Sequence, residues 1–315
     1  YEVLIPKGFF KIFSLATMIV SLASLIFLNF KTAWVITIAS ALVVFVYKSS
    51  VERSLKARLP KLVDETEGGD DTEKAQFPIM SLVALLIGLF FFLSNASIGS
   101  ALSKSAGISF NDIRPSFGTT TEVMRSALYH DPLFGAGAGR YGDVWNLYHP
   151  TAINTTLFWN TPFETGFNLI QSVATTNGLL PTLALIAVLI LSLIHGFKLF
   201  NCQFADRFTR FIAVTSLIMT LAFTMLFLFA SPGIVLIIFG FVYIGLLFGV
   251  SSLVGKTKVL SIEYLKDPRT SFFAILLLVV AAMTGFSAVY FTGNKFASIV
   301  FYNKAVNAAD LTTAE

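Results

Sequence analysis

The chain has 315 residues, of which 55% are hydrophobic and only 13% are charged, about half the charged share of a soluble domain. This composition excludes a single soluble domain, a disordered chain and a collagen-like or disulfide-stapled chain. The single cysteine, Cys202, excludes an internal disulfide and a cysteine-rich metal site. The net charge of +4 does not indicate nucleic-acid binding, because basic residues in membrane proteins mainly mark the cytoplasmic side.

Long stretches without any charge lie at residues 75–103, 165–197 and 212–255, each longer than the ~20 residues that cross a bilayer core. The sequence therefore predicts an all-α, polytopic membrane protein. Because the chain starts with Tyr1 rather than Met, we expect earlier segments to precede it. Seven spans are expected, at residues 9–30, 32–47, 78–94, 182–199, 211–230, 234–253 and 272–291.

The basic residues set the expected orientation. With the N-terminal side in the cytoplasm, 15 of the 22 lysines and arginines lie inside, as the positive-inside rule requires. Residues 1–94 then hold three spans and a cytoplasmic loop at 48–77, and residues 182–292 hold four more. Residues 95–181 form one large extracytoplasmic loop with short helices, long enough to be a site rather than a connector. Residues 293–315 form an extracytoplasmic tail.

The large loop begins with a predicted surface helix. Thr119–Glu122 has the pattern of a capping box, and the helix should end before Asp131-Pro132, because the residue before a proline avoids helical backbone. A stretch with alternating Gly135, Gly137 and Gly139 follows, beside Arg140. This stretch is either a nest of backbone N–H groups that holds a phosphate or a turn after a helix.

Aromatic residues and a second predicted helix complete the loop. Trp145, Tyr148 and Trp159 could stack on sugars or form an interfacial belt, and His149 is either a general base or a surface histidine. Residues 161–164 form another capping-box pattern with a proline at the first helical position, and the helix should end at Gly178. On it, Glu164, Asn168, Gln171 and Thr175 form one polar stripe, which is either a site lining or a water-facing surface.

These features together resemble the bacterial O-antigen ligase and O-antigen polymerase-like membrane proteins. The resemblance covers about sixty residues, from Thr120 to Pro181, and includes the sequence DPLFGAGAGRY at 131–141. The family carries a motif of the form H-x-[N/S/Q]-x9-G, whose last two positions match Asn168 and Gly178. Gly166 stands where the family has His. Lys31, after the first span, takes the place of a family arginine, and residues 301–310 are similar to the start of tetratricopeptide repeats.

The resemblance implies a glycosyltransferase that needs no metal or other cofactor. Such enzymes move a glycan from a polyprenyl-pyrophosphate carrier to an acceptor hydroxyl on a glycan, lipid or protein, at the outer face of the bacterial plasma membrane. Arginine suits phosphate, so the expected pyrophosphate and substrate contacts include Arg140, Lys31, Arg125, Arg114, Asn168, Gln171, Gly135 and Gly137. Glu164 and His149 are the candidates for the base.

Two other functions stay open at this point. A transporter or flippase of a lipid-linked or anionic substrate would carry charged residues inside its spans, and this sequence has almost none there. A non-catalytic relative that serves as a membrane scaffold for the tail is consistent with Gly166 in place of His.

Overall fold

The computed structural model is helical throughout its described part, with no strand there. The described residues are 9–28, 30–51, 78–94, 113–200, 202, 207–254 and 268–312. The chain divides into two compact units, residues 1–258 and residues 259–315, and each is described by itself. The predicted cytoplasmic loop at 48–77 lies largely outside the described residues.

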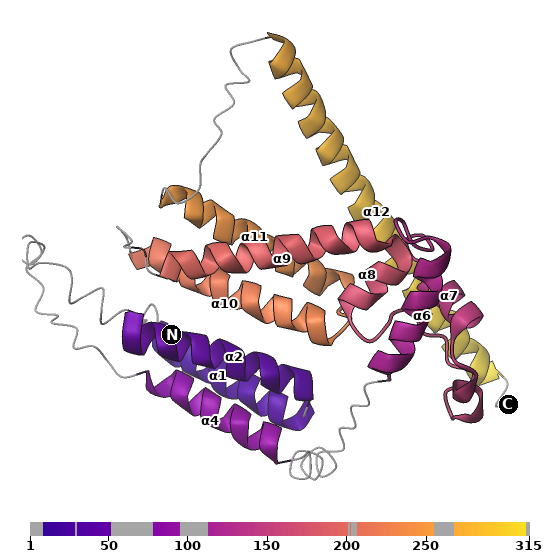
Figure 1. Cartoon of the computed structure of the whole chain (residues 1–315), viewed down its shortest axis with the longest axis horizontal. Coiled ribbons are helices and arrows are strands. Elements are labelled where there is room, and N and C mark those ends of the chain that lie inside the picture. The colour runs from indigo at the N-terminus through magenta and orange to yellow at the C-terminus, as the bar shows by residue number, and fades with distance from the viewer. Residues whose placement is uncertain are drawn as a thin grey trace, which may run out of the picture. The chain divides into compact units, whose positions relative to one another are not determined.

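The described part of the first unit holds six long apolar helices, which are labelled in Figure 1. They are α1 (Phe9–Leu28), α2 (Lys31–Val46), α4 (Ile79–Leu93), α9 (Leu179–Phe200), α10 (Arg207–Phe229) and α11 (Ile234–Leu253). A π-helical turn, η1 (Tyr47–Val51), extends α2. Together with α12 of the second unit, these helices overlap the segments that were predicted as spans.

Among the residues that the structure describes, five helical segments are long and apolar enough to cross a membrane, namely Lys31–Ser49, Leu179–Leu199, Phe208–Phe229, Ile234–Leu253 and Ser271–Val306. The apolar segments Ile12–Leu28 and Ile79–Leu93 are shorter. Large apolar side chains such as Leu183, Ile190 and Phe239 are more than half exposed. Such exposure is expected where a helix faces lipid rather than water. The protein is therefore an integral membrane protein.

Helix α10 packs against α2, α9 and α11, and α2 packs against α4. Small residues allow close contact: Gly240 of α11 lies against the Phe227 ring of α10, and Gly196 of α9 lies against Leu217. Between α2 and α4, the rings of Trp34 and Phe91 stack with centroids 5.1 Å apart. Close approach at small residues is how membrane helices gain dispersion energy without a hydrophobic driving force.

The large loop folds into α6 (Phe117–His130), α7 (Tyr141–Tyr148), the 3-10 turn η2 (Thr151–Thr155) and α8 (Leu169–Asn177). Helix α6 packs on α7 and α8, and α8 also contacts α9 and α10. The loop has its own core, which consists of Val123, Ala127, Tyr141, Val144, Trp145 and Phe163. As predicted, α6 ends before Asp131-Pro132 and α8 ends at Gly178.

Both predicted capping boxes are wrong. The first box would make Thr119 the cap and Thr120 the first helical residue. Helix α6 instead begins at Phe117, because the side chain of Ser116 accepts the N–H of Thr119 and caps the helix. Helix α8 begins at Leu169, where Asn168 accepts the N–H of Gln171. Residues 161–164 have no helical structure.

The described part of the second unit is one helix, α12 (Pro268–Thr312), of 45 residues. It is longer than the predicted span, since it continues without a break through Phe291 and most of the predicted tail. Its described side chains are almost all exposed.

Candidate functional site

The glycine-rich stretch after α6 is a loop docked on the C-terminal end of α8. The N–H groups of Ala136 and Gly137 donate to the carbonyl oxygens of Thr175 and Thr176 over 3.1 and 2.7 Å. A Cβ atom added to Gly135 would lie 2.5 Å from the backbone nitrogen of Gly178, so only glycine permits this approach. Gly135 and Gly178 both have positive φ angles, of 66° and 80°, which glycine adopts at little cost.

This docking favours a turn after α6 over a phosphate-binding nest for Gly135 and Gly137. The N–H groups of residues 135–137 all donate to backbone carbonyls, because Gly135 donates to Asp131 in addition to the two bonds above. Two of these bonds satisfy carbonyl groups at the end of α8, where a helix leaves its last carbonyls without partners. Gly135 and Gly137 therefore build the loop and do not offer these N–H groups to a phosphate.

Two predicted site residues lie near the N-terminal end of α7. Arg140 is the residue just before the helix, and its Nε donates to Asp143 over 3.1 Å in an exposed ion pair. The carboxylate of Glu164 lies beside the same turn, since Oε2 would be 3.6 Å from a Cβ atom added to Gly142. A helix N-terminus carries a partial positive charge. The fold thus gathers an arginine, a carboxylate and a positive helix end, which we call the α7 site.

Glu164 reaches this place from an irregular segment. Next to it, Phe163 is buried and packs edge to face on Trp145, with ring centroids 4.8 Å apart. Glu164 itself is exposed. The prediction that Glu164 closes a capping box is wrong, because α8 begins five residues later, so its carboxylate does not cap that helix.

The other members of the predicted polar stripe are buried. Besides capping α8, Asn168 donates from its amide to the carbonyl of Leu228 over 3.0 Å. The Gln171 amide donates to the Thr121 hydroxyl over 2.8 Å, and Thr175 is completely buried. Asn168 and Gln171 thus join α8 to α10 and α6, and the stripe is neither a water-facing surface nor the lining of an open site.

Gly166 occupies a filled position. Its N–H donates to the Ser172 hydroxyl over 2.9 Å. A Cβ atom at Gly166 would overlap the Thr120 methyl group and lie 3.0 Å from the Tyr141 hydroxyl. The histidine of the resembling family therefore has no vacant place here, because other side chains occupy it.

Tyr141 is almost completely buried beneath this glycine. Burial raises the pKa of Tyr141 to about 12, and the nearby Thr120 side chain lowers it by a smaller amount. The Tyr141 hydroxyl nevertheless has no partner at hydrogen-bond geometry among the described residues. The tyrosine therefore stays neutral at physiological pH. Tyr141 was not among the site residues predicted from the sequence.

Arg114 joins three segments. Its Nη1 donates to the carbonyl oxygens of Phe167 and Phe229 over 3.0 and 2.6 Å, and its guanidinium lies 4.3 Å from the centre of the Phe167 ring. The Phe30 ring is 5.8 Å away, so the start of α2, where Lys31 is exposed, lies near Arg114. These contacts give Arg114 a structural role at the end of α10.

His149 is held by two hydrogen bonds. Its Nδ1 lies 2.8 Å from the carbonyl oxygen of Trp145 and its Nε2 lies 3.0 Å from the side-chain oxygen of Asn154. The ring also stacks on Trp145. Both ring nitrogens of His149 therefore have protein partners. Glu164, by contrast, is exposed and has no hydrogen-bond partner among the described residues.

Arg125 lies apart from the α7 site. It lines a polar pocket of about 530 Å³ on α6, together with Glu122, Ser126, Tyr129, His130 and Tyr148. Glu122, Arg125 and Tyr129 lie on the face of α6 opposite its apolar residues, and all three are exposed. The sequence pattern did not indicate that His130 and Tyr148 close the pocket.

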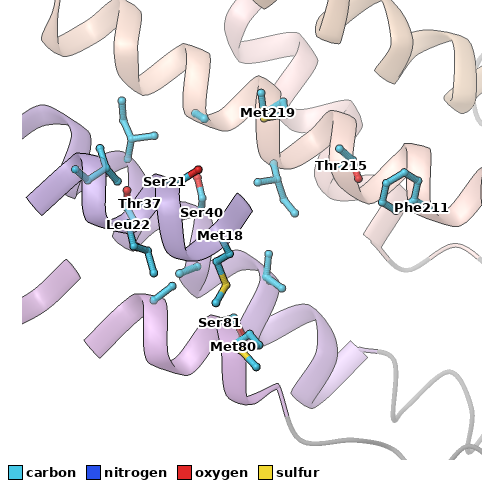
Figure 2. Close-up of a pocket in the computed structure, with 17 residues that line it drawn as sticks. Met18, Ser21, Leu22, Thr37, Ser40, Met80, Ser81, Phe211, Thr215 and Met219 are labelled. Atoms are coloured by element: carbon cyan, nitrogen blue, oxygen red, sulfur yellow. The ribbon is translucent and has the colours of Figure 1, made fainter. Parts of the chain in front are cut away.

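An apolar pocket of about 510 Å³ lies between the long helices (Figure 2). Met18 and Leu22 of α1, Met80 of α4 and Met219 of α10 line it with other apolar side chains. Ser21 and Ser40 add small hydroxyl groups. Its composition suits a hydrocarbon chain, and methionine adapts well to such ligands.

Within the described part of the chain, no three His, Cys, Asp or Glu side chains come together as a metal site requires. No family model, curated protein or solved structure matches the chain.

Proposed function

We propose that the protein is a membrane glycosyltransferase of the O-antigen ligase or polymerase kind, which acts on a polyprenyl-pyrophosphate-linked glycan at the outer face of the bacterial plasma membrane. The observation that carries the proposal is that Arg140 precedes the first turn of α7 and the Glu164 carboxylate lies beside the same turn. They stand on a folded loop that packs directly on apolar, membrane-type helices.

Each group has a defined task in this proposal. The acceptor hydroxyl loses its proton to Glu164, and its oxygen bonds to the anomeric carbon of the donor glycan. The bond from that carbon to the pyrophosphate oxygen breaks, and polyprenyl pyrophosphate leaves with the electron pair. Asp143 uses only the Nε–H of Arg140, so the terminal N–H groups remain for a bidentate contact with phosphate. The positive end of α7 favours the same anion.

The apolar pocket of Figure 2 supports a lipid-linked donor. Its lining suits an isoprenoid chain rather than a sugar. We assign part of the carrier chain to this pocket and the pyrophosphate to the α7 site. Lys31, at the start of α2, adds an exposed positive charge for the pyrophosphate.

The proposal is tested by reconstituting the full chain in liposomes with a polyprenyl-pyrophosphate-linked oligosaccharide and glycan, lipid or protein acceptors. Transfer should occur without added metal. Arg140→Ala should lower the rate about 10²–10³-fold, as expected for loss of one donor that stabilises charge in the transition state, and Arg140→Lys should recover only part. Lys304→Ala, an exposed charge change on α12, is the matched control. An unchanged rate for Arg140→Ala would contradict the assignment.

A further inference from the structure

The polar pocket on α6 is separate from the α7 site and has the features of a second ligand site. Its volume of about 530 Å³ falls within the usual range for small-molecule sites. It lies between two helices, because α6 contributes Glu122, Arg125, Ser126, Tyr129 and His130, and Tyr148 is the last residue of α7.

Three rings in contact with one another form the aromatic wall of this pocket. The rings of His130 and Tyr148 stack with centroids 5.7 Å apart and planes inclined by 26°, and Tyr148 packs on the buried core of the loop. Tyr129 lies edge-on to His130 and is 88% exposed. Rigid, amphipathic rings offer a flat apolar surface with polar edges and lose little conformational entropy on binding.

The charged groups of the pocket balance each other. Glu122 and Arg125 carry opposite charges one helical turn apart, and neither makes an ion pair in the part of the chain that the structure describes. A pyrophosphate would be repelled by the Glu122 carboxylate, and a hydrocarbon chain would leave both charges without partners. A ligand rich in hydroxyl groups satisfies both, since it donates to the carboxylate and accepts from the guanidinium.

We infer that this pocket binds a sugar unit of the glycan chain, with an apolar face of the ring against the tyrosines and the hydroxyl groups on Glu122 and Arg125. The inference rests on the proposed function for the identity of the glycan as substrate. Arg140 and Tyr148 stand at opposite ends of α7, about 12 Å apart along its axis at 1.5 Å per residue. A short oligosaccharide can therefore occupy the pocket while its pyrophosphate end occupies the α7 site.

Direct binding tests this inference without the transfer reaction. The purified full chain in nanodiscs is applied to an array of bacterial repeat-unit oligosaccharides that lack lipid and pyrophosphate. It should bind neutral members, and Tyr148→Ala and Glu122→Gln should each weaken that binding about ten-fold or more. Glu122→Gln keeps the size of the side chain and serves as the variant least able to disturb folding. Tyr302→Ala, an exposed tyrosine on α12, is the matched control and should bind as the parent does.

The outcomes separate this inference from the proposed function. The pocket assignment is overturned, even if transfer is observed, if the parent chain binds no oligosaccharide. It is also overturned if the Tyr148 and Glu122 variants bind as tightly as the parent does. Binding that depends on these residues in a chain without transfer activity supports the pocket and overturns the proposed function instead.

Discussion

Arg114 donates from Nη1 to the carbonyl oxygen of Phe229, the last residue of α10, over 2.6 Å and across 115 positions of sequence. The same guanidinium lies on the Phe167 ring just before α8. A cation at the end of a helix also compensates the partial negative charge of its last carbonyl groups. The large loop is therefore attached to the membrane helices through a charged hydrogen bond as well as through packing.

Loss of this attachment should destabilise the protein. Arg114→Ala is expected to lower the free energy of unfolding by about 1.5–3 kcal/mol, the range for hydrogen bonds to charged groups. Arg114→Lys should recover part of the loss, because it keeps the charge but not the planar contact with Phe167. Thermal unfolding in detergent measures both. Arg125→Ala, an exposed change on α6, should stay within about 0.5 kcal/mol of the parent. Equal stability of the Arg114 and Arg125 variants would contradict the structural role.

The packing around Gly166 predicts a specific coupling with Thr120. Gly166→Ala should cost about 1–3 kcal/mol through overpacking, because the new methyl group overlaps that of Thr120. Thr120→Ser removes this methyl group but keeps the hydroxyl, which accepts the N–H of Phe167 over 3.0 Å. The double variant should therefore be more stable than the sum of the single changes predicts, by about 1 kcal/mol or more. Simple additivity in a double-mutant cycle would contradict the described packing.

The same packing bears on the histidine of the resembling family. Gly166→His introduces a larger side chain where Thr120, Tyr141 and Ser172 already lie. We expect this variant to lose stability and to show no gain in the rate of transfer. A stable, faster Gly166→His variant would show instead that the site tolerates the family residue.

Tyr141 should make stability fall at high pH. Its pKa in the folded chain is about 12, whereas an unperturbed tyrosine titrates near 10. Between these values the unfolded chain releases the proton and the folded chain keeps it, so ionisation favours unfolding. This contribution is fully present below pH 10 and is lost as the pH rises towards 12. Chemical unfolding at pH 9 and pH 11 should show a smaller decline for Tyr141→Phe than for the parent and for the exposed control Tyr129→Phe. Identical declines would refute the assignment.

The sequence alone predicts the membrane helices well, because long uncharged stretches determine them locally. It also predicts the end of α6 from Asp131-Pro132 and the end of α8 from Gly178, since proline and glycine restrict the backbone at their own positions. The beginnings of these helices were less predictable. At α6, both Ser116 and Thr119 are residue types that can cap a helix. Residues 161–164 have the sequence of a capping box but do not form a helix, because Phe163 packs in the core against Trp145.

The arrangement of the predicted site residues could not be predicted from the sequence. Arg140 and Glu164 were both expected to act, yet only the fold shows that both lie at the start of α7. Asn168 and Gln171 were expected on an accessible stripe, but their partners, Leu228 and Thr121, are 60 and 50 positions away. Partners at such separation leave no regular pattern in the sequence, and the same holds for the bond between Ala136 and Thr175.

The central claim, that Glu164 is the base of a glycosyl transfer at the α7 site, is tested most directly by the transfer rate of Glu164→Gln. Glutamine keeps the size and hydrogen bonding of the side chain but cannot take up a proton at neutral pH. Because Glu164 is exposed and does not cap α8, the variant should unfold at the temperature of the parent. We expect its transfer rate in liposomes to be about 10²–10⁴-fold lower. A stably inserted Glu164→Gln protein that transfers glycan as fast as the parent would contradict the claim.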